Sequence, residues 1–367
     1  MKNILVTGGT GSLGWQLIRR LLNDDNIKVT LLVRSNGSVT AQNRVEALLR
    51  ENYDIKKYNI LKDRIDIIDG NIIKPNFGLT KKQIEKLSKE VTNIFHCAAT
   101  TDFNLDYNEI KRVNLDGTKN ILDFALLCMK NESFESVNHI STVAVSGKYQ
   151  GIFYEDYLDK GQDFNNTYEK TKFEAEKLIQ GYRSKGLNVN VFRPSIIVGD
   201  AKNGYTTNFK VVYQPIQIFS LGIYRQIPAR GNTKYNIVPA DYLSDAIYII
   251  FINNLCPNQT FHMTNTHEVS GDFIFKTASE FFYYNDPERI PIEDFDMDKL
   301  KGFRRRLLSP YLPYLNQKGI FYDNTKAMHI LKNSFFKWPE IDQEFLYTIF
   351  RFCIDRNFIT PRNRINL

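Results

Sequence analysis

The feature that most constrains this chain is a glycine-rich turn near its N-terminus. Residues 2–7 predict a short buried strand, and residues 15–22 have the apolar periodicity of a helix. Between them, Thr-Gly-Gly-Thr-Gly-Ser-Leu-Gly occupies positions 7–14. Glycines at this spacing permit a tight turn, close approach of the backbone to a pyrophosphate and close helix–strand packing, and the helix N-terminus attracts the anion. The pattern therefore predicts a dinucleotide site built from Thr7, Gly8, Thr10, Gly11, Ser12, Leu13 and Gly14.

Strand-like and helix-like segments alternate from residue 1 to about residue 200, which predicts an α/β fold with a Rossmann-type doubly wound parallel sheet. The pattern loosens after Pro194, and a helix at 241–251 returns to the core. We expect residues 1–200 plus about 236–262 to form the Rossmann domain. Residues 200–235 and 263–367 would form a smaller, mostly helical portion that binds substrate. The other expected strands are 29–33, 65–68, 93–97, 137–141 and 189–193, and the other expected helices are 44–50, 113–130 and 170–185.

Composition narrows the class of protein. No apolar run approaches the ~18 residues of a membrane span, and the chain opens directly into a strand, so we expect a cytoplasmic protein without a secretory signal. The four cysteines are widely spaced and form no CxxC pair, which predicts reduced thiols and no metal site. Residues 301–367 contain 12 Lys+Arg and 5 Asp+Glu and so carry the whole net charge of +7. This segment favours an acidic or phosphate-bearing partner, or is simply a solvated surface; no nucleic-acid-reading module accompanies it.

The residue that ends the second expected strand bears on the choice of nicotinamide cofactor. A carboxylate there would bind the ribose 2′-hydroxyl and repel a 2′-phosphate. This sequence instead has Arg34, with Arg44 ten residues further on. Guanidinium groups suit a phosphate. The expected cofactor is therefore NADPH.

A second constellation carries the expected chemistry. Tyr168 and Lys172 lie four residues apart, on one face of a predicted helix. An ammonium beside a phenol lowers the phenol pKa, which would make the tyrosine a usable proton donor near neutral pH. Thr142 follows a predicted strand and could share the substrate oxygen. Asn114, at the start of the helix after the fourth strand, would hold the lysine through a water, or would only cap its helix.

Several strings along the chain resemble one group of enzymes. The turn at 7–14, the Thr–Tyr–Lys set and Val-Pro-Ala-Asp-Tyr at 238–242 are similar to extended short-chain dehydrogenases/reductases. Leu-Val-Arg at 32–34 with Arg44, Gly-Asn-Ile at 70–72, His-Cys-Ala-Ala-Thr-Thr-Asp-Phe at 96–103 and Phe-Arg-Pro-Ser-Ile-Ile-Val-Gly at 192–199 narrow the resemblance. They resemble thioester reductase domains of nonribosomal peptide and polyketide synthases, carboxylic acid reductases and fatty acyl-CoA reductases, which share a male-sterility-type NAD(P)-binding domain.

The resemblance implies roles for individual residues. The three glycines at 8, 11 and 14 would bind pyrophosphate, Arg34 and Arg44 the 2′-phosphate, and Thr142, Tyr168 and Lys172 would act in catalysis. The position that is usually an adenine-contacting Asp in this family is Asn71 here, whose amide can still form a hydrogen bond. The other cofactor contacts implied by the resemblance are Ile72, Ala98, Ala99, Pro194, Ser195 and Ile197.

The expected function is NADPH-dependent reduction of an acyl thioester, on a carrier protein or on CoA, to an aldehyde and then, as an open question, to an alcohol. An acidic carrier protein would dock on the basic C-terminal segment, and the substrate would arrive in trans. Two alternatives stay open. One is an extended short-chain ketone or sugar-nucleotide reductase, epimerase or dehydratase, and Arg34 argues against tightly held NAD. The other is a non-catalytic NADP-binding regulator, against which the complete Thr–Tyr–Lys set argues.

Overall fold

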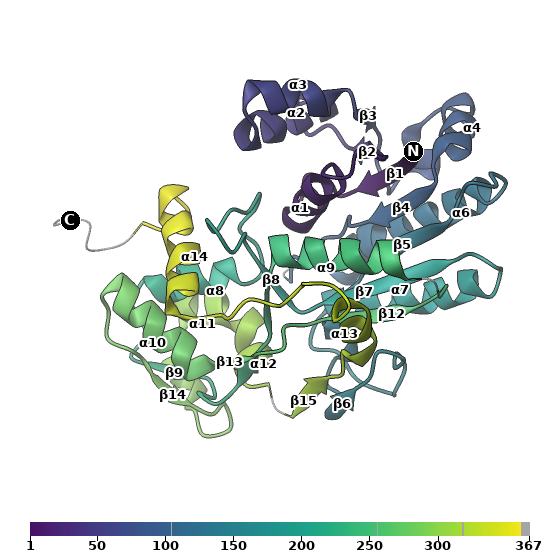
Figure 1. Ribbon diagram of the computed structural model, residues 1–367. Helices are drawn as coiled ribbons and strands as arrows, with labels where there is room; N and C mark the ends of the chain where they lie inside the picture. The colour runs from purple at the N-terminus through teal and green to yellow at the C-terminus, as the bar shows by residue number, and fades with distance from the viewer. Residues whose placement is uncertain (104, 255, 318, 361–367) are drawn as a thin grey trace.

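The centre of the protein is a seven-stranded, fully parallel sheet (Figure 1). The computed structural model describes residues 1–103, 105–254, 256–317 and 319–360. The strand order is β12-β7-β5-β4-β1-β2-β3, so the chain reverses its direction of growth between β1 and β4. Ligands of doubly wound sheets bind beside such a switch point, at the carboxyl ends of the strands. The strands are β1 (Lys2–Thr7), β2 (Ile27–Val33), β3 (Ile65–Asp69), β4 (Asn93–His96), β5 (Ser136–Ile140), β7 (Val189–Pro194) and β12 (Thr260–Met263).

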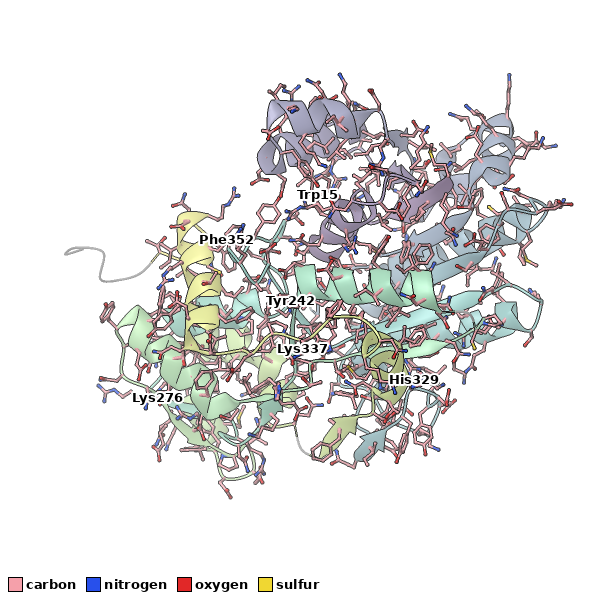
Figure 2. The ribbon with its side chains drawn as sticks, in the orientation of Figure 1. Trp15, Tyr242, Lys276, His329, Lys337 and Phe352 are labelled. Carbon is pink, nitrogen blue, oxygen red and sulfur yellow. The ribbon has the colours of Figure 1, made fainter. Side chains whose placement is uncertain are left out.

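Both faces of the sheet are buried, as a parallel sheet requires. Successive side chains of a strand point to opposite faces. Ile4 and Val6 accordingly join one apolar cluster, while Leu5 between them joins the other. Helices α1 (Ser12–Leu21) and α9 (Ala240–Asn253) contact each other and cover the first face, where Trp15 of α1, labelled in Figure 2, is 1% exposed. The second face carries α4 (Lys81–Glu90), α6 (Gly117–Cys128) and α7 (Thr167–Arg183), and α2 (Ala41–Asn52) and α3 (Ile55–Lys62) connect β2 to β3.

A mostly helical portion follows β8 (Ile196–Val198) and has apolar clusters of its own. Figure 1 shows α8 (Tyr213–Ser220), α10 (Gly271–Phe282) and α14 (Gln343–Asp355) grouped together. Phe352 of α14, labelled in Figure 2, lies 5.9 Å from the ring of Tyr205. The remaining elements are α11 (Gly302–Leu308), α12 (Leu312–Leu315) and short pairs of strands: β9 (Gln226–Pro228) with β14 (Glu288–Ile290), β10 (Lys234–Tyr235) with β13 (Val269–Ser270), and β11 (Ile237–Pro239) with β8.

The chain returns to the Rossmann core near its C-terminal end. Strand β15 (Ile320–Tyr322) pairs in parallel with β6 (Gly151–Phe153), and α13 (Thr325–Leu331) packs on α9 and β12. Ala327, Leu331 and Trp338 belong to the same apolar cluster as the first face of the sheet. Residues 320–340 therefore pack against the Rossmann core and connect it to α14 of the helical portion.

The helix expected at 113–130 is present through Cys128, but it begins earlier, at Tyr107, and contains a π-helical turn. The structure has a short helix α5 (Tyr107–Lys111), then a π-helical turn at Arg112–Asp116, and only then α6. The physical reason is the side chain of Asn114, which exchanges two hydrogen bonds with the backbone of Thr100, at 2.8 and 3.1 Å. A π-turn widens the helix locally and re-aims such a side chain, which is why these turns concentrate at functional sites.

A buried ion pair joins α7 to β7 beneath the site. Arg193 and Glu176 have side chains only 2% and 4% exposed, and the guanidinium Nη2 donates to Oε2 at 2.7 Å. The Nε group donates to both carboxylate oxygens, and the hydroxyl of Ser141 donates to Oε1 at 2.5 Å. Removing one partner of such a pair leaves the other charge buried without a counter-charge.

We expect Arg193→Met to lower the free energy of unfolding by about 3–5 kcal/mol, because Glu176 would lose its counter-charge inside the protein. Urea denaturation followed by circular dichroism measures this loss. The control is Lys81→Met, which removes an exposed ion pair with Glu85 and should change stability by less than about 1 kcal/mol. Equal, small losses in the two variants would show that the buried pair contributes little.

Candidate functional site

The glycine turn has the geometry of a phosphate cradle. Gly8 adopts a left-handed φ of +71°, and a Cβ on it would lie 2.5 Å from the backbone N of Ala98. A Cβ on Gly14 would lie 2.2 Å from the carbonyl oxygen of Gly8. Gly11 is the N-cap of α1 and supplies no capping side chain, so the first N–H groups of the helix stay available to an anion. A larger residue at Gly8 or Gly14 would collide with neighbouring backbone and deform the turn.

Arg34 and Arg44 lie together beside this turn. The Arg44 guanidinium donates to the carbonyl oxygen of Arg34 at 2.6 Å and to the hydroxyl of Thr10 at 2.8 Å. Burial, followed by the nearby charge of Arg34, lowers the pKa of Arg44. The neighbouring carboxylate of Asp69 is engaged by the backbone N–H and hydroxyl of Ser35. Two adjacent cations beside a phosphate cradle fit one further phosphate group.

Thr142 and Tyr168 meet at the carboxyl end of β5. Their side chains are neighbours, and both line one cavity. Burial raises the pKa of Tyr168 to about 12, and the interaction with Thr142 only partly opposes it. The expectation that Lys172 lowers this pKa is wrong for the structure, because the lysine ammonium makes its hydrogen bonds elsewhere. Tyr168 is therefore a neutral phenol, which can donate a hydrogen bond.

Lys172 is fully buried behind the tyrosine on α7. Its Nζ donates to the carbonyl oxygen of Ile140 at 2.7 Å and lies 3.2 Å from Nε2 of His139. Burial lowers its pKa to about 8. The side chain of Asn114 hydrogen-bonds the backbone of Thr100 and the hydroxyl of Thr171, the neighbour of Lys172. Asn114 thus fixes the loop after β4 against α7.

Three other residues of the turn have side chains that contact protein groups. Thr7 is fully buried, and its hydroxyl pairs with Nδ1 of His96 at 2.7 Å. Leu13 is buried in the first apolar cluster. The hydroxyl of Ser12 lies 2.5 Å from that of Thr206 and accepts from the amide of Asn208 at 3.1 Å. The turn therefore offers mainly its backbone, together with Thr10.

The predicted contacts at the ends of β3 and β4 lie on loops around the same edge. Asn71 is half-buried, and its side chain accepts from the N–H of Ile73. Ile72 is 9% exposed and packs in the second cluster. Ala98 contacts the glycine turn, whereas Ala99 is exposed. These residues lie on the loops after β3 and β4, and the side chain of Asn71 already has a local hydrogen-bond partner.

A cavity of about 590 Å³ joins the end of the sheet to the helical portion. The predicted residues Pro194, Ser195 and Ile197 line it, together with Thr142 and Tyr168. Helices α8, α10 and α14 supply an apolar wall that includes Ile216, Phe219, Phe275, Ala278 and Phe350. This volume suits an organic group held beside the Tyr168 hydroxyl.

Sequence reasoning missed the aromatic cover of Tyr168. Phe103 lies 5.8 Å from the ring of Tyr168 and stacks on Tyr314 of α12 at 5.6 Å. The Tyr314 hydroxyl donates to the buried carboxylate of Glu169 at 2.7 Å. Both neighbours lie far from Tyr168 in the chain, so no spacing rule could find them. The one indication in the sequence was Glu169 next to Tyr168, because a carboxylate beside a buried residue needs a hydrogen-bond donor such as the Tyr314 hydroxyl.

Two further findings concern membrane-spanning helices and metal sites. Within the described ranges, no helix is both long and apolar enough to cross a bilayer. The same residues contain no group of three or more His, Cys, Asp or Glu side chains placed to hold a metal ion.

Comparisons with known proteins agree with this architecture. The terminal R domain of the myxalamid PKS-NRPS pathway superimposes with a TM-score of 0.82 at 24% identity, covering 98% of this chain and 92% of that one. A linear gramicidin synthase polypeptide of Brevibacillus parabrevis is 24% identical over 361 residues, 93% of this chain and 7% of that protein. Human fatty acyl-CoA reductase 1 is 29% identical over 277 residues, 65% of this chain and 52% of that protein.

The sheet, the glycine cradle and the Thr–Tyr–Lys set define an extended short-chain dehydrogenase/reductase fold with an NAD(P)-binding domain. The model of the male sterility protein family matches residues 6–247, and the chain belongs to that family. The resemblance seen in the sequence is thereby confirmed. The chain spans about half or less of the length of these two curated relatives.

We expect Gly14→Ala to weaken NAD(P)H binding by at least about tenfold, because the new Cβ would collide with the Gly8 carbonyl and deform the cradle. Fluorescence titration of the nicotinamide measures the affinity. The control is Gly181→Ala in α7, whose Cβ would meet nothing within 4 Å. Unchanged affinity in a folded Gly14→Ala protein would contradict a pyrophosphate site in this turn.

Proposed function

We propose that this protein reduces an acyl thioester, carried by a carrier protein or by CoA, to an aldehyde with NADPH, and that the aldehyde can be carried on to the alcohol. One observation carries the proposal. The neighbouring side chains of Thr142 and Tyr168 face a largely apolar cavity at the carboxyl end of the sheet, the end that also carries the glycine turn. The likeness to a fatty acyl-CoA reductase and to synthase R domains supports an acyl substrate.

The choice of NADPH rests on Arg34 and Arg44. The cradle at Gly8, Gly11 and Gly14 would hold the pyrophosphate, and the two guanidinium groups would hold the 2′-phosphate. Asn71, Ile72, Ala98 and Ala99 would border the adenosine side. When bound, NADPH supplies the hydride that reduces the carbonyl carbon of the thioester.

The chain's own residues would manage the charge and protons of the reaction. Thr142 and Tyr168 donate hydrogen bonds to the carbonyl oxygen as negative charge develops on it, where preorganised donors have their largest effect. The tetrahedral product, a hemithioacetal, then collapses to aldehyde and free thiol. Burial of Tyr168 keeps its proton on the phenol until the oxyanion takes it. Lys172 would hold positive charge behind the tyrosine while the phenol gives up its proton, and a proton from solvent would restore the phenol before the next turnover.

The apolar wall of the cavity would bind the acyl group. The space beyond Tyr168 is lined by Val212, Ile216, Phe219 and Phe350, which would exclude water from the carbonyl.

The protein would act in the cytoplasm, where acyl thioesters and reduced cofactor are present.

The acidic partner would dock on the basic C-terminal segment. Arg304, Arg305 and Arg306 are exposed on α11, and this helix leads through Pro310 to α12, whose Tyr314 and Leu315 line the cavity. A basic surface at the cavity attracts an acidic carrier domain or the phosphates of CoA. Arg362 and Arg364, which add to the charge of the segment, lie outside the described residues.

We expect purified protein to consume NADPH with an acyl thioester, and Tyr168→Phe to lower this rate at least about a hundredfold, because the proton donor is lost. Loss of NADPH absorbance across a panel of acyl-CoA and acyl-pantetheine thioesters measures the rate. Tyr154→Phe, on a half-exposed tyrosine outside the cavity lining, is the matched control. Turnover of a ketone or sugar nucleotide, with no thioester consumed, would refute the assignment.

We expect Arg44→Ala to weaken NADPH binding by roughly tenfold to a hundredfold and to leave NADH binding nearly unchanged, because only NADPH carries the 2′-phosphate. Isothermal titration with each cofactor gives the two affinities. Arg50→Ala, an exposed arginine on the same helix, serves as the control. Equal losses for both cofactors would assign Arg44 to the fold rather than to the phosphate.

A further inference from the structure

The ammonium of Lys172 has two acceptors, and both belong to β5. The carbonyl oxygen of Ile140 accepts at 2.7 Å, and Nε2 of His139 lies 3.2 Å away. An ammonium has three N–H donors and no acceptor. Two of the three are therefore directed at one strand, which leaves the third for a ligand or for the tyrosine.

His139 is a neutral imidazole in this contact. Its side chain is 1% exposed, and burial, followed by the charge of Lys172, holds its pKa well below the usual range. A neutral imidazole has one donor and one acceptor nitrogen. Because the ammonium donates, Nε2 must be the acceptor and Nδ1 must carry the proton.

Packing alone does not explain this histidine. Its Nδ1 is buried and has no hydrogen-bond partner among the described residues. An unpaired buried N–H is unfavourable, so an apolar side chain would suit the strand better than histidine does. Among the described residues, the hydrogen-bond partner of this imidazole is the ammonium of Lys172.

The next strand provides an internal comparison. His96 lies directly opposite His139 in the sheet, with ring centroids 5.3 Å apart, and is equally buried. Its two nitrogens pair with the hydroxyls of Thr7 and Thr118, at 2.7 and 3.1 Å. His96 is thus satisfied by the fold, whereas His139 is paired with the lysine.

The other titratable groups around the ammonium come from three elements. Glu176 on α7 and Cys97 after β4 act to raise the pKa of Lys172, and burial, the largest influence, lowers it to about 8. His96 on β4 is neutral, because burial lowers its pKa to about 3. Arg183 on α7 acts on His139 in the same direction as Lys172. Burial thus works against the charged form of the lysine, and hydrogen-bond acceptors at the ammonium favour that form.

We propose that His139 is a positioning residue, whose neutral Nε2 keeps Lys172 protonated and fixes the direction of its remaining N–H. The proposal rests on the proposed function for its consequence in catalysis. The residue that holds the Lys172 ammonium would thus be a side chain of β5, in addition to the helix residue Asn114 that the sequence suggested. The chemistry of the lysine then depends on β5, and Thr142 lies two residues after the end of that strand.

The test compares His139→Leu, His139→Gln and His96→Leu over a range of pH. Removing the acceptor favours the neutral amine, so the alkaline limb of kcat/KM for thioester reduction should move down by about one pH unit in His139→Leu. His139→Gln, which keeps an acceptor near the place of Nε2, should restore the limb. His96→Leu should lower Tm and leave the limb in place.

A second measurement does not depend on activity. NMR titration of the ¹³C-labelled Lys172 side chain, assigned with Lys172→Met, should show the same downward shift in His139→Leu and its recovery in His139→Gln. If His139→Leu does not fold, His139→Met replaces it. An unmoved lysine titration in a folded apolar variant overturns the role of His139. Failure of the wild type to reduce any thioester, with the titration shifted as expected, overturns only the proposed function.

Discussion

The parallel pairing of β1 with both β2 and β4 is the constraint on which the rest of the molecule depends. Because β1 lies at the switch point, the loops after β1 and β4 separate to opposite sides and leave a crevice between them. Gly8 and Ala98 approach each other across that crevice so closely that no side chain fits on the glycine. The candidate groups, from the guanidinium pair after β2 to Tyr168 on the helix between β5 and β7, lie on segments that connect strands of this parallel sheet.

The sequence was most informative where local rules act alone. The glycine spacing at 7–14 and the β-branched runs on either side of it specify a strand, a turn and a helix without reference to distant residues. The same is true of Tyr168 and Lys172, which share a helix face by spacing. Family resemblance added Asn71 and the residues around Pro194, which no periodicity distinguishes.

The remainder of the site depends on contacts between distant segments. The π-turn at Asn114 arises from hydrogen bonds to Thr100, and the partner of Lys172 is decided by the register of β5 beside α7. The pKa of Tyr168 follows from burial under Phe103 and the helical portion, and burial is a property of the folded chain. Spacing alone had suggested the opposite direction. One signal was present, since Asn138 and His139 are polar residues in a strand buried on both faces.

The hydrogen bonds of Ser12 have a consequence for how the protein could be modified. Its hydroxyl, at the first position of α1, is tied to Thr206 and Asn208. The same stretch of chain continues within a few residues to Val211 and Val212, which line the cavity. Under the proposed function, a change to residues 206–212 made to suit a new acyl chain would also disturb the contacts of Ser12, at the start of the helix that would bind the cofactor phosphates.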